Sequence, residues 1–150
     1  MSDQRQALLD KARRFCDYQE RCMHEVQEKL LSLEADKADI QHIIKILESE
    51  NLLNEGRYAR AFAKGKLRSN KWGKNKIKAA LQIKRIQAEI IQKALEEIDE
   101  DEYLEILNQI IENKQVKAPN ERMEKAKKAQ YAIQKGFESG LVWGIVNRKI

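Results

Sequence analysis

The chain has 150 residues, of which 42% are hydrophobic and 35% are charged, and its formal net charge is +5. This length supports one domain, or a short array of small ones, with a real apolar core. One proline and the lack of β-branched runs favour an all-α chain over a sheet protein. No stretch approaches the roughly 18 apolar residues of a membrane span and the N-terminus lacks an apolar signal core, so we expect a cytoplasmic protein without membrane contact.

Charge is strongly segregated along the chain. Residues 1–55 contain 8 basic and 12 acidic groups, whereas residues 56–88 contain 11 basic groups and no acidic group. Residues 89–112 contain 1 basic and 9 acidic groups, and residues 113–150 contain 9 basic and 3 acidic groups. Because a block of one sign repels itself, the segment 56–88 is typical of a surface that meets an anion.

Apolar residues at helical spacing predict three helices before residue 54. The first spans about Asp3 to Tyr18, and the second starts near Arg21. Asp36 is the expected N-cap of the third helix, with Asp39 in the capping-box position. The residues expected to face inward are, helix by helix, Leu8, Ala12, Phe15 and Cys16; Met23, Val26, Leu30 and Leu33; and Ile40, Ile43, Ile44 and Leu47.

The block 56–88 predicts two basic helices joined by a turn around residues 69–73, with Asn54 as the N-cap of the first helix. The inward-facing residues of the two helices are expected to be Tyr58, Ala59, Phe62, Ala63, Ile77, Ala80 and Leu81. The outward-facing cations should form one positive surface, which we call the basic stripe: Arg57, Arg60, Lys64, Arg68, Lys71, Lys74 and Lys78.

The basic stripe is the candidate partner-binding site. A solvated helix face is the ordinary explanation of such a pattern, but the complete lack of acids between positions 56 and 88 favours a contact with an anionic partner. That partner is either DNA phosphate or an acidic protein surface, and the sequence leaves both open. Trp72, in the turn between the basic helices, either packs on its own core or stacks on exposed bases.

Four more helices are expected after the basic block. The third of these spans Glu121 to about Lys135, after the break at Pro119, and Gly136 is its expected C′ residue with Phe137 as the hydrophobic contact. The inward-facing residues of the four helices are expected to be Ile86, Ile90, Ile91, Leu95 and Ile98; Tyr103, Leu107, Ile110 and Ile111; Met123, Ala126, Ala129 and Ile133; and Leu141, Val142, Ile145 and Val146, with Trp143 partly exposed.

The nine expected helices divide into three similar sets. Paired apolar residues recur in each third helix, at Ile43-Ile44, Ile90-Ile91 and Leu141-Val142. A period of about 45 to 50 residues predicts three tandem three-helix repeats. The expected units span 1–53, 54–98 and 99–150. Because such units touch only their neighbours, we expect an all-α, elongated and curved array, and a monomer.

No set of residues predicts covalent chemistry. Cys16, Cys22, His24 and His42 are of the types that bind zinc, but Cys22 and His24 lie two positions apart and point to different sides of a helix. There is no Gly-rich phosphate loop, and the acidic run after the basic block has no partnered base. We therefore expect no catalytic residue, no metal site and no cofactor.

Several short motifs recur in a fixed order over nearly the whole chain. Residues 52–59 read LLNEGRYA, and they are followed by Phe62, Trp72-Gly73, Lys76-Ile77 and Leu81. These motifs resemble the central repeat of the RecX family, whose members regulate, and mainly inhibit, the RecA recombinase. The segments resembling the first and last repeats of that family are Glu25-Val26 with Lys29-Leu30, and Tyr131 to Ile145 around Gly136-Phe137.

One position departs from the family pattern. Arg85-Ile86 stands where the family usually has Gly-Ile. Glycine would supply a left-handed helix C-cap without steric cost. The arginine must either adopt that conformation with strain or end the helix differently.

The resemblance implies a regulator, most often an inhibitor, that modulates DNA recombination and repair. It implies binding in the groove of the RecA–DNA filament, across neighbouring protomers. The basic stripe would face the negative interior of that groove, while the acidic segment 96–105 keeps another part of the molecule off DNA. The alternative is a helical protein that binds single- or double-stranded DNA through the basic stripe without RecA, and binding to bare DNA would favour it.

Overall fold

The computed structural model describes residues 2–149, and among these residues all regular secondary structure is helical. The elements are α1 (Asp3–Tyr18), α2 (Met23–Ser32), α3 (Lys37–Ser49), α4 (Glu55–Gly65), the short π-helix η1 (Lys66–Asn70), α5 (Lys74–Ile83), α6 (Ala88–Glu96), α7 (Glu100–Asn113), α8 (Glu121–Gln134) and α9 (Ser139–Lys149). The predicted all-α class is therefore confirmed. None of the described helices is long and apolar enough to cross a membrane.

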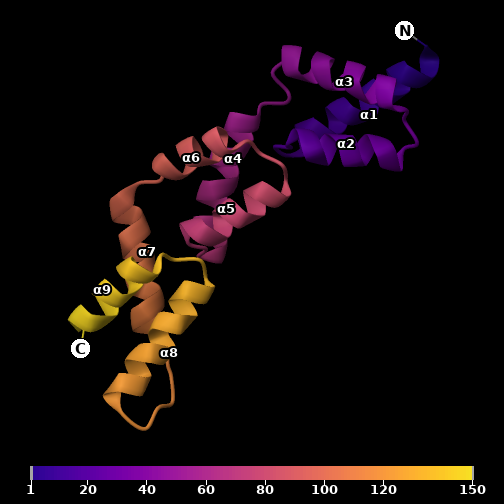
Figure 1. The fold of residues 1–150 in the computed structure, drawn as a ribbon. Helices are drawn as coiled ribbons and strands as arrows, with labels where there is room; N and C mark the ends of the chain where they lie inside the picture. Colours follow the sequence, from indigo (N-terminus) through magenta and orange to yellow (C-terminus); the bar gives the residue numbers. More distant parts are fainter. Residues whose placement is uncertain (1, 150) are drawn as a thin grey trace.

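The helices form three bundles that follow one another in an arc (Figure 1). The bundles are α1–α3, α4–α6 with η1, and α7–α9, and the main contacts of each helix lie within its own bundle. The bundles that contain the first and the last described helix, α1 and α9, lie at opposite ends of the arc (Figure 1). The predicted elongated array of three tandem three-helix repeats is confirmed.

The third helices of the three bundles recur at a constant spacing, and the second helices of the first two bundles share it, whereas α8 begins earlier, at Glu121. Helices α3, α6 and α9 begin at Lys37, Ala88 and Ser139, and α2 and α5 begin at Met23 and Lys74. This spacing is slightly longer than the predicted period. The turn between the second and third helix also has one length in all three bundles, at residues 33–36, 84–87 and 135–138.

Each of these turns contains a residue with left-handed backbone. The φ angles are 63° at Glu34, 60° at Arg85 and 102° at Gly136. The Phe137 N–H donates to the Ala132 carbonyl at 3.2 Å, and equivalent bonds close the other two turns, as in a Schellman motif. The predicted roles of Gly136 and Phe137 are confirmed. Arg85 takes the left-handed conformation, which is the strained alternative of the two.

Side-chain caps fix the start of several helices. The Asp36 carboxylate accepts from the Asp39 N–H at 2.8 Å, and the Asn54 side chain accepts from the Arg57 N–H at 2.9 Å, so both predicted N-caps are confirmed. The Asp39 side chain does not complete a capping box. Its carboxylate instead accepts from Arg5 Nε at 2.5 Å, because α1 packs beside α3 and brings the guanidinium within reach.

The buried residues form two cores. The first belongs to α1–α3, and the second runs continuously through α4–α9 and also takes in Cys22 from the first bundle. All residues predicted to face inward in α3 and α7 are buried. The prediction for Met123 is wrong, because its side chain is 43% exposed; the first turn of α8 lies at the far end of the array (Figure 1), and Ala129 and Ala132 supply the buried face instead.

Candidate partner-binding surface

The basic stripe lies along α4, η1 and the start of α5. Tyr58, Ala59 and Ala63 of α4 are buried, so the cations between them project outward from the second core. Helix α4 continues directly into η1, and Lys71 then takes a left-handed backbone with φ 56° that ends the helical segment. Gly73 is the N-cap of α5, where the stripe resumes.

Arg57 connects the second bundle to the first. Its guanidinium donates to the carboxylate of Glu20, between α1 and α2, and to the Asn51 carbonyl at 2.9 Å. The side chain is half-buried. These contacts hold α4 to the first bundle, which is a structural task for a residue that the sequence assigned to partner binding.

Three further members pair with acids from the segment that precedes and opens α7. Arg60 Nε lies 3.5 Å from a Glu97 carboxylate oxygen, and Lys74 Nζ lies 3.4 Å from Glu100. Arg68 donates two hydrogen bonds to Glu102, at 2.7 and 3.0 Å. The acidic segment 96–105, expected to act elsewhere on the molecule, therefore lies against the basic stripe and neutralises part of its charge.

The contact between Arg68 and Glu102 shifts the pKa of both side chains. The hydrogen bond from Arg68 lowers the pKa of Glu102, and the charges of Arg68 and Lys64 add to this effect. The same hydrogen bond raises the pKa of Arg68. Both side chains are solvated, so the pair orients the guanidinium more than it stabilises the fold.

The remaining stripe members are exposed lysines. Within residues 2–149, Lys64, Lys71 and Lys78 form no ion pair with a carboxylate. Lys71 lines a small cleft of about 220 Å³ with Lys114 and Tyr131. The positive charge that an outside partner meets on this surface comes chiefly from these lysines.

Trp72 packs on its own core and also carries cations. Its ring lies edge-on to Phe62, with ring centroids 6.5 Å apart, and both rings border the second core. Lys66 Nζ lies 5.0 Å and Lys76 Nζ 4.8 Å from the centroid of the Trp72 ring. The sequence offered packing on the core and stacking on bases as alternatives, and Trp72 does pack against the second core, while its binding role stays a prediction.

Lys66 and Lys76 were not among the predicted site residues. Lys66 lies four positions after Phe62, a spacing that puts two residues on one face of a helix and was available as a signal. Trp72 lies outside the helices, so its contact with Lys76 could not be predicted from helical spacing. The prediction instead followed the 57, 60, 64 and 68 series, which selects the other side of α4.

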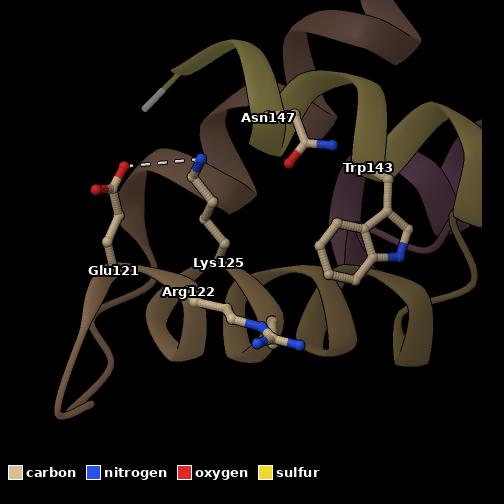
Figure 2. A pocket seen from close by; sticks show the side chains of 6 residues that line it. Glu121, Arg122, Lys125, Trp143 and Asn147 are labelled. Carbon is tan, nitrogen blue, oxygen red and sulfur yellow. Dashed lines mark ion pairs between the residues drawn. The ribbon is translucent and has the colours of Figure 1, made fainter.

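A second aromatic cleft lies between α8 and α9, as shown in Figure 2. Its volume is about 560 Å³, and Trp143, which is 39% exposed as expected, forms one wall. Arg122 and Lys125 stand on the α8 side, where Lys125 Nζ lies 3.7 Å from a Glu121 oxygen. The acid beside this lysine makes the cleft less basic than the surroundings of Trp72.

The cysteines and histidines do not gather into a metal site. Among the described residues, no group of three or more His, Cys, Asp or Glu side chains is placed to hold a metal ion. Burial raises the pKa of the free Cys22 thiol to about 11 and also raises that of Cys16. His24 Nε2 lies 3.0 Å from a carboxylate oxygen of Glu28, on the same helix.

The chain is similar to known proteins along most of its length. Residues 54–95 match the family model described as RecX, second three-helix domain. Regulatory protein RecX of Clostridium beijerinckii is 30% identical over 128 residues, which cover 83% of this chain and 59% of that protein. Regulatory protein RecX of Clostridioides difficile is 28% identical over 141 residues, which cover 93% of this chain and 66% of that protein.

The fold also matches a solved structure. The crystal structure of RecX from Lactobacillus salivarius aligns with a TM-score of 0.85 and 24% identity, over 99% of this chain and 97% of that one. The curated relatives are longer. The chain spans 34% of the length of Regulatory protein RecX of Lactobacillus gasseri, which is 36% identical over 95 residues, and about three fifths of the length of the Clostridium beijerinckii protein.

Proposed function

We propose that this chain is a member of the RecX family, that it regulates a RecA recombinase and that the regulation is inhibitory. The observation that carries the proposal is the likeness to Regulatory protein RecX over most of the chain. In this role the protein binds the RecA–DNA filament in the cytoplasm and restrains recombination and repair. The role needs no covalent chemistry, because binding alone hinders strand exchange or promotes filament disassembly.

The arc of three bundles supports binding along a filament. A filament groove presents the same surface repeatedly, and an elongated molecule reaches more than one protomer where a compact one reaches a single site. The three bundles touch in sequence and lie along one curve (Figure 1). In the proposal the arc lies in the groove and spans neighbouring RecA protomers, as a monomer.

The charge distribution supports one orientation of the chain on the filament, with the basic stripe toward the groove. The basic stripe faces the negative interior of the groove, and Lys64, Lys71 and Lys78 make the first contacts because no acid of the described chain pairs with them. Arg60, Arg68 and Lys74 exchange their carboxylate partners for groups on the filament. Exposed single pairs are weak, so such an exchange costs little. Several charges facing one concave surface then act together.

The test is an assay of RecA ATPase and DNA strand exchange with the full chain added. We expect both rates to fall in proportion to the protein added, at concentrations near that of RecA. Stimulation of either rate would contradict inhibition, and the absence of any effect would contradict regulation itself. Sedimentation of the protein with preformed RecA filaments separates filament binding from competition for free DNA.

A second function, nucleic-acid binding without RecA, is favoured by one observation. The lysines beside Trp72 have no carboxylate partner within the described chain and lie on aromatic rings. Binding of bare DNA at physiological salt would support this function, and binding only to the RecA-coated filament would support the regulator alone.

A further inference from the structure

The turn between η1 and α5 combines aromatic rings with ammonium groups. Lys66 Nζ lies 5.5 Å from the Phe62 ring centroid and 5.0 Å from that of Trp72, while Lys76 Nζ lies 4.8 Å from the Trp72 centroid. Both rings are half-buried, so each keeps an accessible part at the surface. We call Phe62, Lys66, Trp72 and Lys76 the Trp72 cluster.

Acids are absent from this cluster, in contrast to the basic stripe. Within residues 2–149, neither Lys66 nor Lys76 forms an ion pair, and their neighbours are aromatic rings. The stripe on the other side of α4 is partly neutralised by the acids at the start of α7. The ammonium groups of the Trp72 cluster are therefore available to an anionic ligand, because no carboxylate of the described chain pairs with them.

The same composition continues beside the cluster. Lys135 Nζ donates to the Asn70 carbonyl at 2.8 Å, which places another cation at the η1–α5 turn. Lys71, in that turn, lines the small cleft in which Lys114 Nζ lies 4.2 Å from the Tyr131 ring centroid. Lysines and aromatic rings thus alternate across the contact between the second and third bundles.

Unpaired lysines can bind an acidic peptide or a nucleic acid, and the neighbouring aromatic rings favour one of these two partners. An acidic peptide gains only from the ammonium groups and makes no use of an aromatic face. A single-stranded nucleic acid uses both, because its bases stack on the ring while its phosphates take the ammonium groups. An exposed cation–π contact is weaker than a stacked base, so a base displaces the lysine from the ring and the lysine moves to the phosphate.

We propose that the contact between the second and third bundles binds single-stranded nucleic acid, with a base stacked on Trp72 and adjacent phosphates bound by Lys66 and Lys76. The strand then passes Lys71 toward Tyr131, which offers the second stacking surface. Duplex DNA does not fit this arrangement, because its bases are already stacked. The site rests on the second function proposed above, nucleic-acid binding without RecA, and names its ligand and residues; it does not depend on the regulation of RecA.

The test uses the full chain with Trp143→Phe, so that Trp72 is the only tryptophan and reports its own surroundings. A (dT)15 oligonucleotide is added in the absence of RecA, in parallel with a poly-glutamate peptide of similar charge and a duplex. We expect (dT)15 to quench the Trp72 fluorescence through stacking and to bind more tightly than either competitor. Binding should weaken with salt, with a log-log slope of about −0.7 per phosphate neutralised.

Substitutions test whether Trp72, Lys66 and Lys76 form the binding site. Trp72→Leu keeps an apolar side chain on the core and should weaken (dT)15 binding about tenfold, through the loss of one stacked base. Because this variant has no tryptophan, its binding is measured by the fluorescence anisotropy of labelled (dT)15. K66E/K76E should weaken (dT)15 binding strongly and reduce the salt slope of the binding that remains by about 1.4, the share of two phosphates. The matched control is K37E/K45E, which reverses two exposed lysines of α3 that have no carboxylate partner in the described chain. If K66E/K76E loses helicity, K66Q/K76Q repeats the test.

Several results would overturn the proposal. Poly-glutamate that binds and shifts Trp72 fluorescence as well as (dT)15 would make the site an acidic-peptide site. Loss of (dT)15 binding in K64E/K78E, but not in K66E/K76E, would move nucleic-acid binding to the basic stripe. No binding of (dT)15 at low salt would exclude the site altogether. None of these results bears on RecA inhibition, which is measured separately.

Discussion

The two contacts between neighbouring bundles use equivalent positions but different chemistry. In both, the first amide of a second helix donates to a side chain of the next bundle. The Met23 N–H meets the Glu55 carboxylate at 3.3 Å, and at the equivalent position one repeat later the Lys74 N–H meets the Tyr103 hydroxyl at 2.9 Å. The first contact thus places a charge at a position where the second places a neutral group.

The contact between the second and third bundles includes backbone packed directly on backbone, beside the exposed ion pairs of Arg68 with Glu102 and of Lys74 with Glu100. The Gly73 N–H donates to the Lys135 carbonyl at 2.8 Å, and the Asn75 N–H donates to the Gly136 carbonyl at 2.9 Å. A Cβ atom on Gly73 would lie 2.3 Å from the Gly136 carbonyl carbon, so no other residue fits there without movement. The cores of these two bundles also merge into one. We infer that they move as a unit.

The contact between the first and second bundles depends on ionisable side chains. Besides Glu55, it contains the pair of Glu20 with Arg57 and the pair of Glu25 with Lys84, whose atoms lie 3.5 Å apart. The equivalent of Gly136 is Arg85, which lines an open groove of about 540 Å³. Only Cys22 of the described first bundle joins the second core. This contact is therefore the looser of the two and the natural place for the arc to bend.

The largest expected effects come from matched core truncations. Leu30 and Leu81 occupy equivalent positions in successive repeats, and both are fully buried, one in each core. Each Leu→Ala change should cost about 2–5 kcal/mol of unfolding free energy through lost burial and a residual cavity. Hydrogen exchange should show Leu30→Ala exposing amides of α1–α3, and Leu81→Ala exposing amides of α4–α9. Equal exposure of all these helices by both variants would mean that the two cores are not independent.

Gly73→Ala tests the backbone contact directly. The added Cβ meets backbone atoms that have no room to rotate away, so we expect a loss of about 1–3 kcal/mol or more, measured by urea unfolding. The control is Gly140→Ala in α9, whose Cβ would have no neighbouring atom within 4 Å. That change should be neutral or stabilise by up to about 1 kcal/mol. Similar stabilities for the two variants would show that the bundles are not packed as described.

Arg85→Gly should act in the opposite direction. Left-handed backbone costs a non-glycine residue roughly 1–2 kcal/mol, and glycine removes this strain at the expense of unfolded-state entropy. The expected net gain is about 0.5–1 kcal/mol in thermal or urea unfolding. Glu34→Gly is the matched variant, because Glu34 holds the same position in the first bundle. If both glycine variants were less stable than the parent, the Arg85 and Glu34 side chains would make contacts that stabilise the fold by more than the backbone strain destabilises it.

Glu55→Gln should give the smallest effect, and one that depends on pH. Burial raises the pKa of Glu55, with Glu48 and Glu25 adding to it, although the hydrogen bond from Met23 opposes the rise. The folded state then binds the proton more tightly than the unfolded state, so ionised Glu55 destabilises the fold above its folded pKa. Near neutral pH, Glu55→Gln should be slightly more stable than the parent. That gain should fade as pH falls toward the unfolded value of 4.5.

A gain for Glu55→Gln that stays constant between about pH 7 and pH 4, measured by urea unfolding, would contradict this assignment. Arg13 lowers the pKa of Glu50 through a hydrogen bond, so the stability from that exposed pair changes in the opposite sense. It is present above the unfolded pKa of Glu50 and is lost as pH falls through the folded pKa. Comparing parent and variant at each pH cancels this background.

Most of the fold could be predicted from patterns among residues that are close together in the sequence. Helix α1 begins and ends at the predicted residues, and Asp36, Asn54 and the Gly136 turn were all readable from neighbouring positions. The surroundings of the basic stripe were not readable in this way. The acid that meets Arg68 is Glu102, far along the chain, and its position depends on how α7 follows the second bundle. The contact of Gly73 with Gly136 is likewise set by tertiary packing between segments of two different repeats.

The proposed restraint of RecA acts through the members of the basic stripe that form no ion pair within the described chain, Lys64, Lys71 and Lys78. The most direct test compares RecA ATPase inhibition by the parent, by K64E/K78E and by the matched K37E/K45E on α3. All three should keep the same helicity and melting temperature, because the four lysines are exposed. We predict that K64E/K78E needs on the order of tenfold more protein for half-inhibition, while K37E/K45E behaves as the parent. Equal inhibition by all three folded proteins would contradict the claim and leave the stripe a solvated face.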